Sequence, residues 1–450
     1  MLHRRLSVSK LKNGSASERL CDGAALLLLL LPVLLTFLYV RAFAVELPYF
    51  DDWGIGIPQL THLETRSFRW SDLNVRHTES VVLFPQMVHL TAARLARYGV
   101  LVTMYISCMF LCGSLGVLFL FFRRLRLPGR WSILWFLPVS IFFMSWRQSE
   151  GLLWSTHLVN TMALFFSLLA LYGCVRAQES IDFFGAAIAS AWVATFSMAS
   201  GVLIWPIGWL YLAISGSLAA PRAGMRRVAI WTVSGGVCLA CFVLDRAPNS
   251  VGWRPGIAYL RSNLGTAGQY ILIYFGSPFN HDPGWAIWAG AVFVLAAVLT
   301  VYFAVRKTVR QDGVLAAMML IALVTLALGP LLAFRLDLGA EEAVSSRYVT
   351  LGSLAAIGVY FCLLALKPKT PAARYLLIVM AALFLPGVVD SYASGLEDGR
   401  ENRAYEIQCA AIVRDFRHRA PAELQCANPD AEGILVYMRY LERRHLSLFQ

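Results

Sequence analysis

Uncharged apolar runs of about 18 residues or more recur along almost the whole 450-residue chain. A helix of that length crosses the hydrocarbon core of a bilayer while satisfying its own backbone hydrogen bonds. The runs are continuous rather than alternating in polarity, which excludes a β-barrel. The sequence therefore predicts an all-α polytopic membrane protein.

The placement of the positive charges predicts how the chain is oriented. Only 15% of the residues are charged and the net charge is +12. All five lysines lie in an N-terminal arm or in short segments between apolar runs, which the positive-inside rule assigns to the cytoplasm: Lys10, Lys12, Lys307, Lys367 and Lys369. Anionic lipid headgroups are the expected counter-charges, and nucleic acid is not an expected partner.

Three parts of the chain differ in composition. Residues 1–21 are expected to form a cytoplasmic basic arm, residues 22–393 a bundle of about eleven transmembrane helices, and residues 394–450 a periplasmic tail. The first span, at about residues 23–44, ends in an Ala-x-Ala sequence like a signal-peptidase site. Its apolar core is longer than the ~7–15 residues of a signal peptide, which favours a retained anchor.

Two apolar segments are not expected to cross the membrane directly. Residues 46–100 form the first outer loop, and residues 78–98 within it predict an amphipathic helix in the outer interface. Residues 259–277 begin and end on the outer side, so they predict an interfacial or re-entrant helix. The other spans are expected at residues 101–122, 131–146, 152–175, from 183 to 200, through 205–206, 228–244, 284–305, 314–334, 348–366 and 374–393.

Two of the nine cysteines, Cys409 and Cys426, share the tail. A disulfide between them is possible if the tail faces an oxidising compartment, and the sequence leaves it open whether they pair. Six others lie in predicted spans, where cysteine usually serves as a small packing residue.

Ionisable residues gather at the predicted outer ends of the spans, and none lies near the middle of a span. The group comprises Asp51, Asp52, Glu79, Arg147, Glu150, His157, Asp245, Asp282, Arg335, Asp337, Glu341, Glu342, Arg347 and Asp390. A secondary transporter or pump usually needs charged or strongly polar groups at the midplane of the membrane. The pattern therefore favours a site that faces one side only.

Such a one-sided site suits glycosyl transfer from a lipid-phosphate sugar. A carboxylate acts as the general base on an acceptor hydroxyl, which typically contributes about 10²–10⁴-fold. The lipid-phosphate leaving group needs arginine around its developing charge, and Arg335 and Arg347, with Tyr348, are placed for this role. The further candidates for substrate binding are His77, Arg147, Glu150 and His157.

This layout resembles that of the GT-C glycosyltransferases, which include the protein O-mannosyltransferases and the aminoarabinose and arabinofuranosyl transferases. The matching features are a cytoplasmic N-terminus, one span, an outer loop opening with Phe50-Asp51-Asp52, an interfacial helix and a many-span bundle. The resemblance implies that Asp51 is the catalytic base and that Asp52 is its partner or a metal ligand. It also implies a polyprenyl-phosphate sugar donor and a site on the periplasmic face of a bacterial inner membrane.

The chain is also similar to a group of bacterial membrane proteins with a D-x-W element and an H-N-E-H-R-like element in the first outer loop. Here these elements read Asp51-Asp52-Trp53 and His77-Thr78-Glu79-Ser80; the glutamate matches, and the His and Arg after it are absent. This resemblance adds Glu79 to the catalytic candidates. The other similar stretches are Glu150 to Trp154, Ser200-Gly201 with Trp205-Pro206, and Ser346-Arg347-Tyr348.

Each candidate also has a structural interpretation. The acid pair can solvate its loop, Glu79 can be the N-terminal acid of a helix capped by Thr78, and Arg347 can be an interfacial anchor. His157 and Asn160, about one turn apart, can form a packing pair within the bundle.

The sequence leaves open whether the protein binds a metal and whether it has one of two other functions. Asp52 and Glu79 suit Mg²⁺ or Mn²⁺ chemically, but no ligand spacing requires a metal. The predicted acceptor is a glycan, a lipid or a protein. A transporter or flippase of a lipid-linked substrate and a non-catalytic scaffold are the alternatives to a transferase.

Overall fold

The computed structural model describes residues 16–65, 67–77, 80–219, 221–244, 253–308, 311–366 and 371–450. Within these ranges the chain is almost entirely helical, and its one sheet is a short antiparallel hairpin of β1 (Arg76–His77) and β2 (Ser80–Val81). The prediction of an all-α membrane protein is confirmed at this level, because the helices of the described part include several that are long and apolar enough to cross a membrane.

Nine helices of the described part reach that length and composition. Each contains an apolar stretch of 18 residues with no more than two charged residues, which is long enough to cross a bilayer core. They are α1 (Ala16–Phe43), α4 (Val100–Arg124), α7 (Leu158–Arg176), α9 (Ile204–Ala219) with the turn before it, α10 (Pro221–Leu244), α13 (Pro283–Thr308), α14 (Asp312–Arg335), α15 (Ser346–Leu366) and α16 (Pro371–Arg414).

The span expected at residues 131–146 is not one helix. It consists of a 3-10 helix, η4 (Arg130–Phe136), and the seven-residue α5 (Leu137–Phe143). Pro138 lies in the first turn of α5, where its missing N–H does no harm. The same residue would interrupt a continuous α-helix that began at residue 131, and this explains why the apolar run is divided.

The span expected from residue 183 to 200 is shortened to α8 (Ile181–Thr195), which has 15 residues. The chain turns back sharply after it and brings Gly201 close to the end of α8. A Cβ on Gly201 would lie 2.0 Å from the carbonyl oxygen of Ala194. Only glycine permits that approach. With these two segments short, the expected count of about eleven spans is not confirmed.

The two segments expected at the interface are helical with different bounds and are partly packed into the protein. The helix expected at residues 78–98 is α3 (Leu83–Leu95), which buries Gln86 and His89 among other residues. The segment 259–277 contains two helices, α11 (Trp253–Ser262) and α12 (Leu264–Gly276), and Tyr270 and Tyr274 of α12 are buried. The remaining short α-helices are α2 (Ile57–Glu64), α6 (Ser149–Leu153), α17 (Pro421–Leu424) and α18 (Ala431–Arg444).

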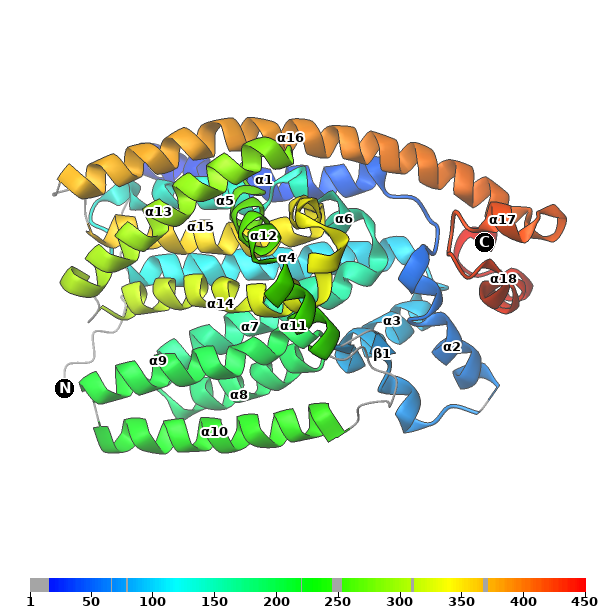
Figure 1. Ribbon diagram of the computed structural model, residues 1–450, viewed down its shortest axis with the longest axis horizontal. Coiled ribbons are helices and arrows are strands. Elements are labelled where there is room, and N and C mark those ends of the chain that lie inside the picture. Colours follow the sequence, from blue (N-terminus) through cyan, green and yellow to red (C-terminus); the bar gives the residue numbers. More distant parts are fainter. Residues whose placement is uncertain are drawn as a thin grey trace.

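The long helices lie side by side along the longest axis of the molecule (Figure 1). Helix α15 packs against α13, α14 and α16, and most of its residues are buried. Helices α8, α9 and α10 form one side of the bundle, and α16 lies along the opposite side (Figure 1). Helix α6 contacts the first turn of α15, where the N–H of Glu150 donates to the hydroxyl of Ser346.

Helix α16 is the longest element, with 44 residues. At about 1.5 Å per residue it extends about 66 Å, roughly twice the thickness of a bilayer core. The expected limit between residues 393 and 394 falls inside this helix. Beyond the bundle, the C-terminal part of α16 leads into α17 and α18 (Figure 1).

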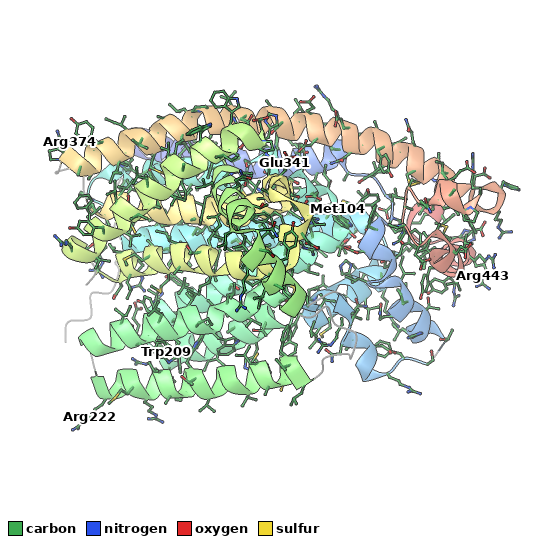
Figure 2. All side chains as sticks on the ribbon, viewed as in Figure 1. Met104, Trp209, Arg222, Glu341, Arg374 and Arg443 are labelled. Atoms are coloured by element: carbon green, nitrogen blue, oxygen red, sulfur yellow. A yellow bond between two sulfur atoms is a disulfide. The ribbon has the colours of Figure 1, made fainter. Side chains whose placement is uncertain are left out.

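The first loop and the expected cytoplasmic turns can be placed at the two ends of the bundle. Arg222 and Arg374 lie at one end, whereas Arg443 lies at the other (Figure 2). The first-loop helices α2 and α3 share this second end with α17 and α18 (Figure 1). The first loop, which contains Asp51 and Asp52, and the expected cytoplasmic turns therefore lie at opposite ends of the molecule.

Candidate functional site

The tandem acids lie in a single 3-10 turn, η2 (Phe50–Trp53). The N–H of Tyr49 donates to Oδ2 of Asp52 at 3.0 Å, and the N–H of Asp52 donates to the carbonyl of Tyr49 at 3.0 Å. Asp52 is 1% exposed, whereas Asp51 is half-buried. The turn therefore gives two adjacent carboxylates two different environments.

Asp52 connects the first loop to the start of α7. The hydroxyl of Ser155 donates to Asp52 Oδ1 at 2.5 Å, and the hydroxyl of Thr156 donates to the same oxygen. Both come from the 3-10 turn η6 (Ser155–His157). Burial raises the pKa of Asp52 to about 6, although the bonds from Ser155, Thr156 and Tyr49 favour the ionised form.

The proton on Asp52 gives a measurable pH dependence. The folded state keeps this proton up to about pH 6, whereas the unfolded chain releases it near 3.8, so the folded form binds more protons in between. The unfolding free energy is therefore expected to fall as pH rises through this window and to level off above it. Infrared titration should show a protonated-carboxyl band that disappears near pH 6 and is missing in Asp52→Asn. In Ser155→Ala the midpoint should rise; an unchanged midpoint would mean that Ser155 does not stabilise the carboxylate.

A second polar cluster joins α6 to the start of α15. Glu150 Oε2 accepts from the hydroxyls of Ser345 at 3.0 Å and Ser346 at 3.1 Å, and from the N–H of Arg347 at 3.2 Å. Burial acts to raise the pKa of Glu150, but His157, Arg347 and these donors outweigh it and hold the pKa below its ordinary value. Glu150 is therefore ionised at neutral pH.

Arg347 lies between two carboxylates. Its guanidinium bonds to Glu342, and its Nη1 lies 3.9 Å from Glu150 Oε1. Its side chain is 30% exposed, so part of the guanidinium stays accessible. Glu342 also accepts from the hydroxyl of Tyr348 at 3.4 Å, and the charge of Arg335 acts on that hydroxyl.

The two clusters meet at His157. The indole N–H of Trp154 donates to the carbonyl of Tyr49 at 3.1 Å, which ties the acid turn to the segment after α6. The buried His157 interacts electrostatically with Glu150, Arg347 and Asp51. Five predicted site residues, Asp51, Asp52, Glu150, His157 and Arg347, are thus brought to one end of the bundle.

A cavity with both polar and apolar groups in its wall extends from this cluster into the bundle. It offers about 50 Å³ to the centres of water molecules, enough for a few waters. Gln148, His157, Asn160, Arg347 and Thr350 contribute polar groups to its wall. Asp51 is not part of the wall. A larger cavity of about 410 Å³, with an almost wholly apolar wall, lies among α5, α15 and α16 and contains none of the predicted site residues.

Arg147 is close to this cluster but is not part of the cavity wall. It is buried, donates to the carbonyl of Val344 at 2.6 Å, lies 3.9 Å from Asp398 and interacts electrostatically with Glu150. Glu79 lies outside the described residues. For His77 only the backbone is described, where it pairs with Ser80 in the β1–β2 hairpin.

The site also contains residues that the sequence analysis did not select. Ser155, Thr156, Ser345 and Ser346 hold the carboxylates, and no pattern in the sequence indicates which acid a hydroxyl will reach. Glu406 of α16 is 9% exposed and interacts electrostatically with Asp52. It was missed because it lies in the segment assigned to a separate tail.

The described residues contain no group of three or more His, Cys, Asp and Glu that could hold a metal ion. The carboxylate oxygens of Asp52 already accept three hydrogen bonds from Tyr49, Ser155 and Thr156. The described surroundings of Asp52 therefore do not fit the Mg²⁺ or Mn²⁺ site that the sequence left open, and the other candidate ligand, Glu79, lies outside the described residues.

Comparison with protein-family models, curated proteins and solved structures finds no match for this chain.

Proposed function

We propose that this protein is a GT-C-like membrane glycosyltransferase. It moves a sugar from a polyprenyl-phosphate donor to a glycan, lipid or protein acceptor at the periplasmic face of a bacterial inner membrane. The supporting observation is that Asp51, Glu150 and Arg347 all interact electrostatically with the buried His157, and that His157 and Arg347 line a cavity at this end of the bundle. A general base and an anion-binding group are the two parts that this reaction needs.

Asp51 is the proposed general base. It is half-buried, so an acceptor hydroxyl can reach it, whereas Asp52 is enclosed and already accepts three hydrogen bonds. The role of Asp52 is then to hold the turn against Ser155 and Thr156. This division agrees with the resemblance, in which the first acid of the pair is the base.

Arg347 is the proposed partner of the lipid phosphate. A guanidinium matches the paired oxygens of a phosphate and neutralises the charge that develops on the leaving group. Arg347 is partly exposed and is held by Glu150 and Glu342. An incoming phosphate would compete with Glu342, while Glu150 keeps the guanidinium oriented.

The charge pattern supports the proposed periplasmic orientation. Arg222 and Arg374 lie at the end of the bundle opposite the acid turn (Figures 1 and 2). The positive-inside rule assigns such arginine-bearing turns to the cytoplasm, which leaves the acid turn on the other side. The disulfide between Cys409 and Cys426, at the same end as the acid turn, is typical of an oxidising compartment.

The test is a transfer assay on the purified protein in proteoliposomes. A panel of radiolabelled polyprenyl-phosphate sugars is added with cell-envelope glycans, lipids and proteins as acceptors. We expect release of polyprenyl phosphate together with labelled acceptor. A lipid-linked label that changes leaflet without cleavage would instead identify a flippase. If no donor is cleaved or moved, the scaffold interpretation stands.

A further inference from the structure

The C-terminal segment contacts the acid turn at the residue directly before Asp51. The N–H of Phe50 donates to the carbonyl of Ala427 at 2.8 Å, and the side-chain amide of Asn428 donates to the carbonyl of Phe50 at 2.8 Å. Both backbone polar groups of Phe50 therefore bond to a segment that follows it by more than 370 residues.

Phe50 has a backbone conformation that needs such support. Its φ is 44°, in the left-handed region. Bulky residues other than glycine rarely adopt this region, and they keep it only where surrounding contacts enforce it. The conformation matters because it directs the chain into the turn that carries Asp51 and Asp52.

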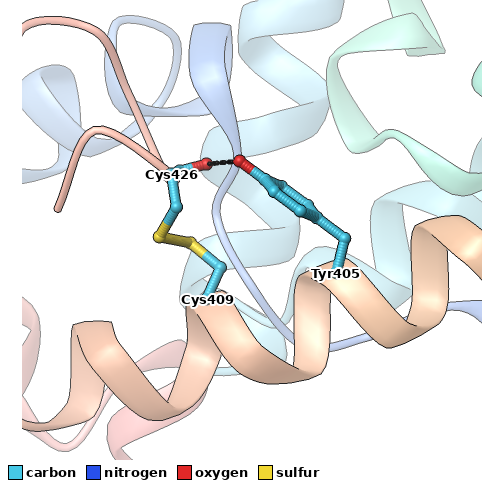
Figure 3. Close-up of a disulfide and its surroundings, with 3 residues drawn as sticks. All are labelled: Tyr405, Cys409 and Cys426. Carbon is cyan, nitrogen blue, oxygen red and sulfur yellow. Dashed lines mark hydrogen bonds between the residues drawn. A yellow bond between two sulfur atoms is a disulfide. The ribbon is translucent and has the colours of Figure 1, made fainter. Parts of the chain in front are cut away.

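The segment that holds Phe50 is itself anchored to α16. Cys426 forms a disulfide with Cys409, and its carbonyl accepts from the hydroxyl of Tyr405 at 3.1 Å (Figure 3). The side-chain oxygen of Asn428 accepts from the N–H of Asp430 at 2.8 Å, which fixes the amide with its NH₂ group toward Phe50. Ala427 and Cys409 are almost fully buried.

A residue near the C-terminus, Ser447, makes a second contact with the first loop. The hydroxyl of Ser447 donates to Glu46 Oε1 at 3.1 Å, and the same carboxylate accepts from the N–H groups of Val100 and Leu101 at the start of α4. The C-terminal segment is thus packed against the first loop at both ends of the stretch from Glu46 to Phe50.

We propose that residues 426–428, anchored to α16 by the Cys409–Cys426 disulfide, are a clamp that fixes Phe50 and thereby positions Asp51 and Asp52. Asn428 is the positioning residue of this clamp. It touches neither acid and acts through the carbonyl of Phe50. The clamp concerns only the structure of the turn, and only its effect on sugar transfer rests on the proposed function.

Loss of the clamp has a defined structural consequence. Without Ala427 and Asn428, Phe50 relaxes to negative φ and the turn rotates away from Ser155 and Thr156. This rotation lets water reach Asp52, whose charged neighbours are Asp51 in its own turn and Glu406 on α16. It also shifts Asp51 relative to His157, with which Asp51 interacts electrostatically.

The test uses hydrogen–deuterium exchange on the full-length protein in lipid nanodiscs. Asn428→Asp keeps the size of the side chain and replaces its donor by an oxygen that repels the carbonyl of Phe50. Exchange in peptides covering residues 47–53 should become faster by roughly tenfold or more, because the turn loses a hydrogen bond and its restraint. The double variant Cys409→Ser/Cys426→Ser should do the same. The control, Glu432→Gln, changes an exposed side chain of α18 on the same segment and should leave exchange unchanged.

Two further readouts separate positioning from general stability. The infrared titration of Asp52 should move to lower pH in Cys409→Ser/Cys426→Ser, which adds no charge near the turn, because hydration favours the carboxylate. Transfer should fall in kcat by up to about 10²-fold while the KM for the donor is kept, because the acid is displaced and the arginine is not.

Unchanged exchange in both variants and an unchanged Asp52 titration in the double cysteine variant would overturn the clamp. Protection lost across α7 and α15 as well would also overturn it, because the segment would then support the whole fold. If the native protein transfers no sugar, the proposed function fails, while exchange and the infrared titration still decide the clamp.

Discussion

Asp51→Asn is expected to lower sugar transfer by about 10²–10⁴-fold while the protein stays inserted and folded. The amide has nearly the shape of the carboxylate, but it cannot accept the proton of the attacking hydroxyl. The variant leaves unchanged Asp52, which accepts the hydrogen bonds from Tyr49, Ser155 and Thr156 that fix the turn. The measurement is the initial rate of polyprenyl-phosphate release in proteoliposomes at saturating donor.

The matched control is Asp415→Asn. Asp415 carries an ion pair with Arg419, and its side chain is 43% exposed beyond the C-terminal end of α16. The same chemical change there should leave transfer unchanged. A folded Asp51→Asn protein with full activity would remove Asp51 as the base. Equal losses in both variants would point to a general effect of charge at this end of the molecule.

Gly290→Ala is expected to prevent stable folding. Helices α12 and α13 cross with their backbones in direct contact: a Cβ on Gly290 would lie 1.8 Å from the carbonyl oxygen of Leu272, and one on Gly276 would lie 1.8 Å from that of Ala286. Small residues permit this approach in membrane helices. The helices must separate to accept a methyl group, which should lower the unfolding free energy by about 3 kcal/mol or more. The measurement is the fraction of monodisperse protein in detergent after heating.

Gly268→Ala is the control for this prediction. Gly268 lies on the same helix α12, is exposed, and has no atom within 4 Å of the position of a Cβ. Alanine there should leave the protein as stable as before or stabilise it by about 0.5–1 kcal/mol, since alanine is the better helix former. A Gly290→Ala protein as stable as Gly268→Ala would show that the two helices are not in such close contact.

The amino-acid sequence alone determined the class of protein and most of its long helices. The span expected at residues 101–122 became α4 (Val100–Arg124), and that at 348–366 became α15 (Ser346–Leu366). This succeeded because the length of an apolar run is a local property and the bilayer requires it to be helical. The cluster of ionisable residues at one end of the spans was likewise visible, and five of the predicted site residues lie together.

Only the tertiary structure decided that α16 continues beyond its apolar part. Residues after 393 are polar and contain Gly395 and Gly399, so the sequence predicted the end of a span. The helix continues because these glycines pack closely against Trp146 and against Tyr39 and Phe43. Contacts with distant elements outweighed the weak helix propensity of glycine.

The partners of the site residues were also decided by tertiary contacts. Ser155 reaches Asp52 across 103 positions of sequence, and Asn428 reaches Phe50 across 378. A hydroxyl or an amide carries no local signal of the acceptor that it will meet, because that depends on how the helices pack. The acids could therefore be found in the sequence, while the groups that hold and position them became visible only in the folded chain.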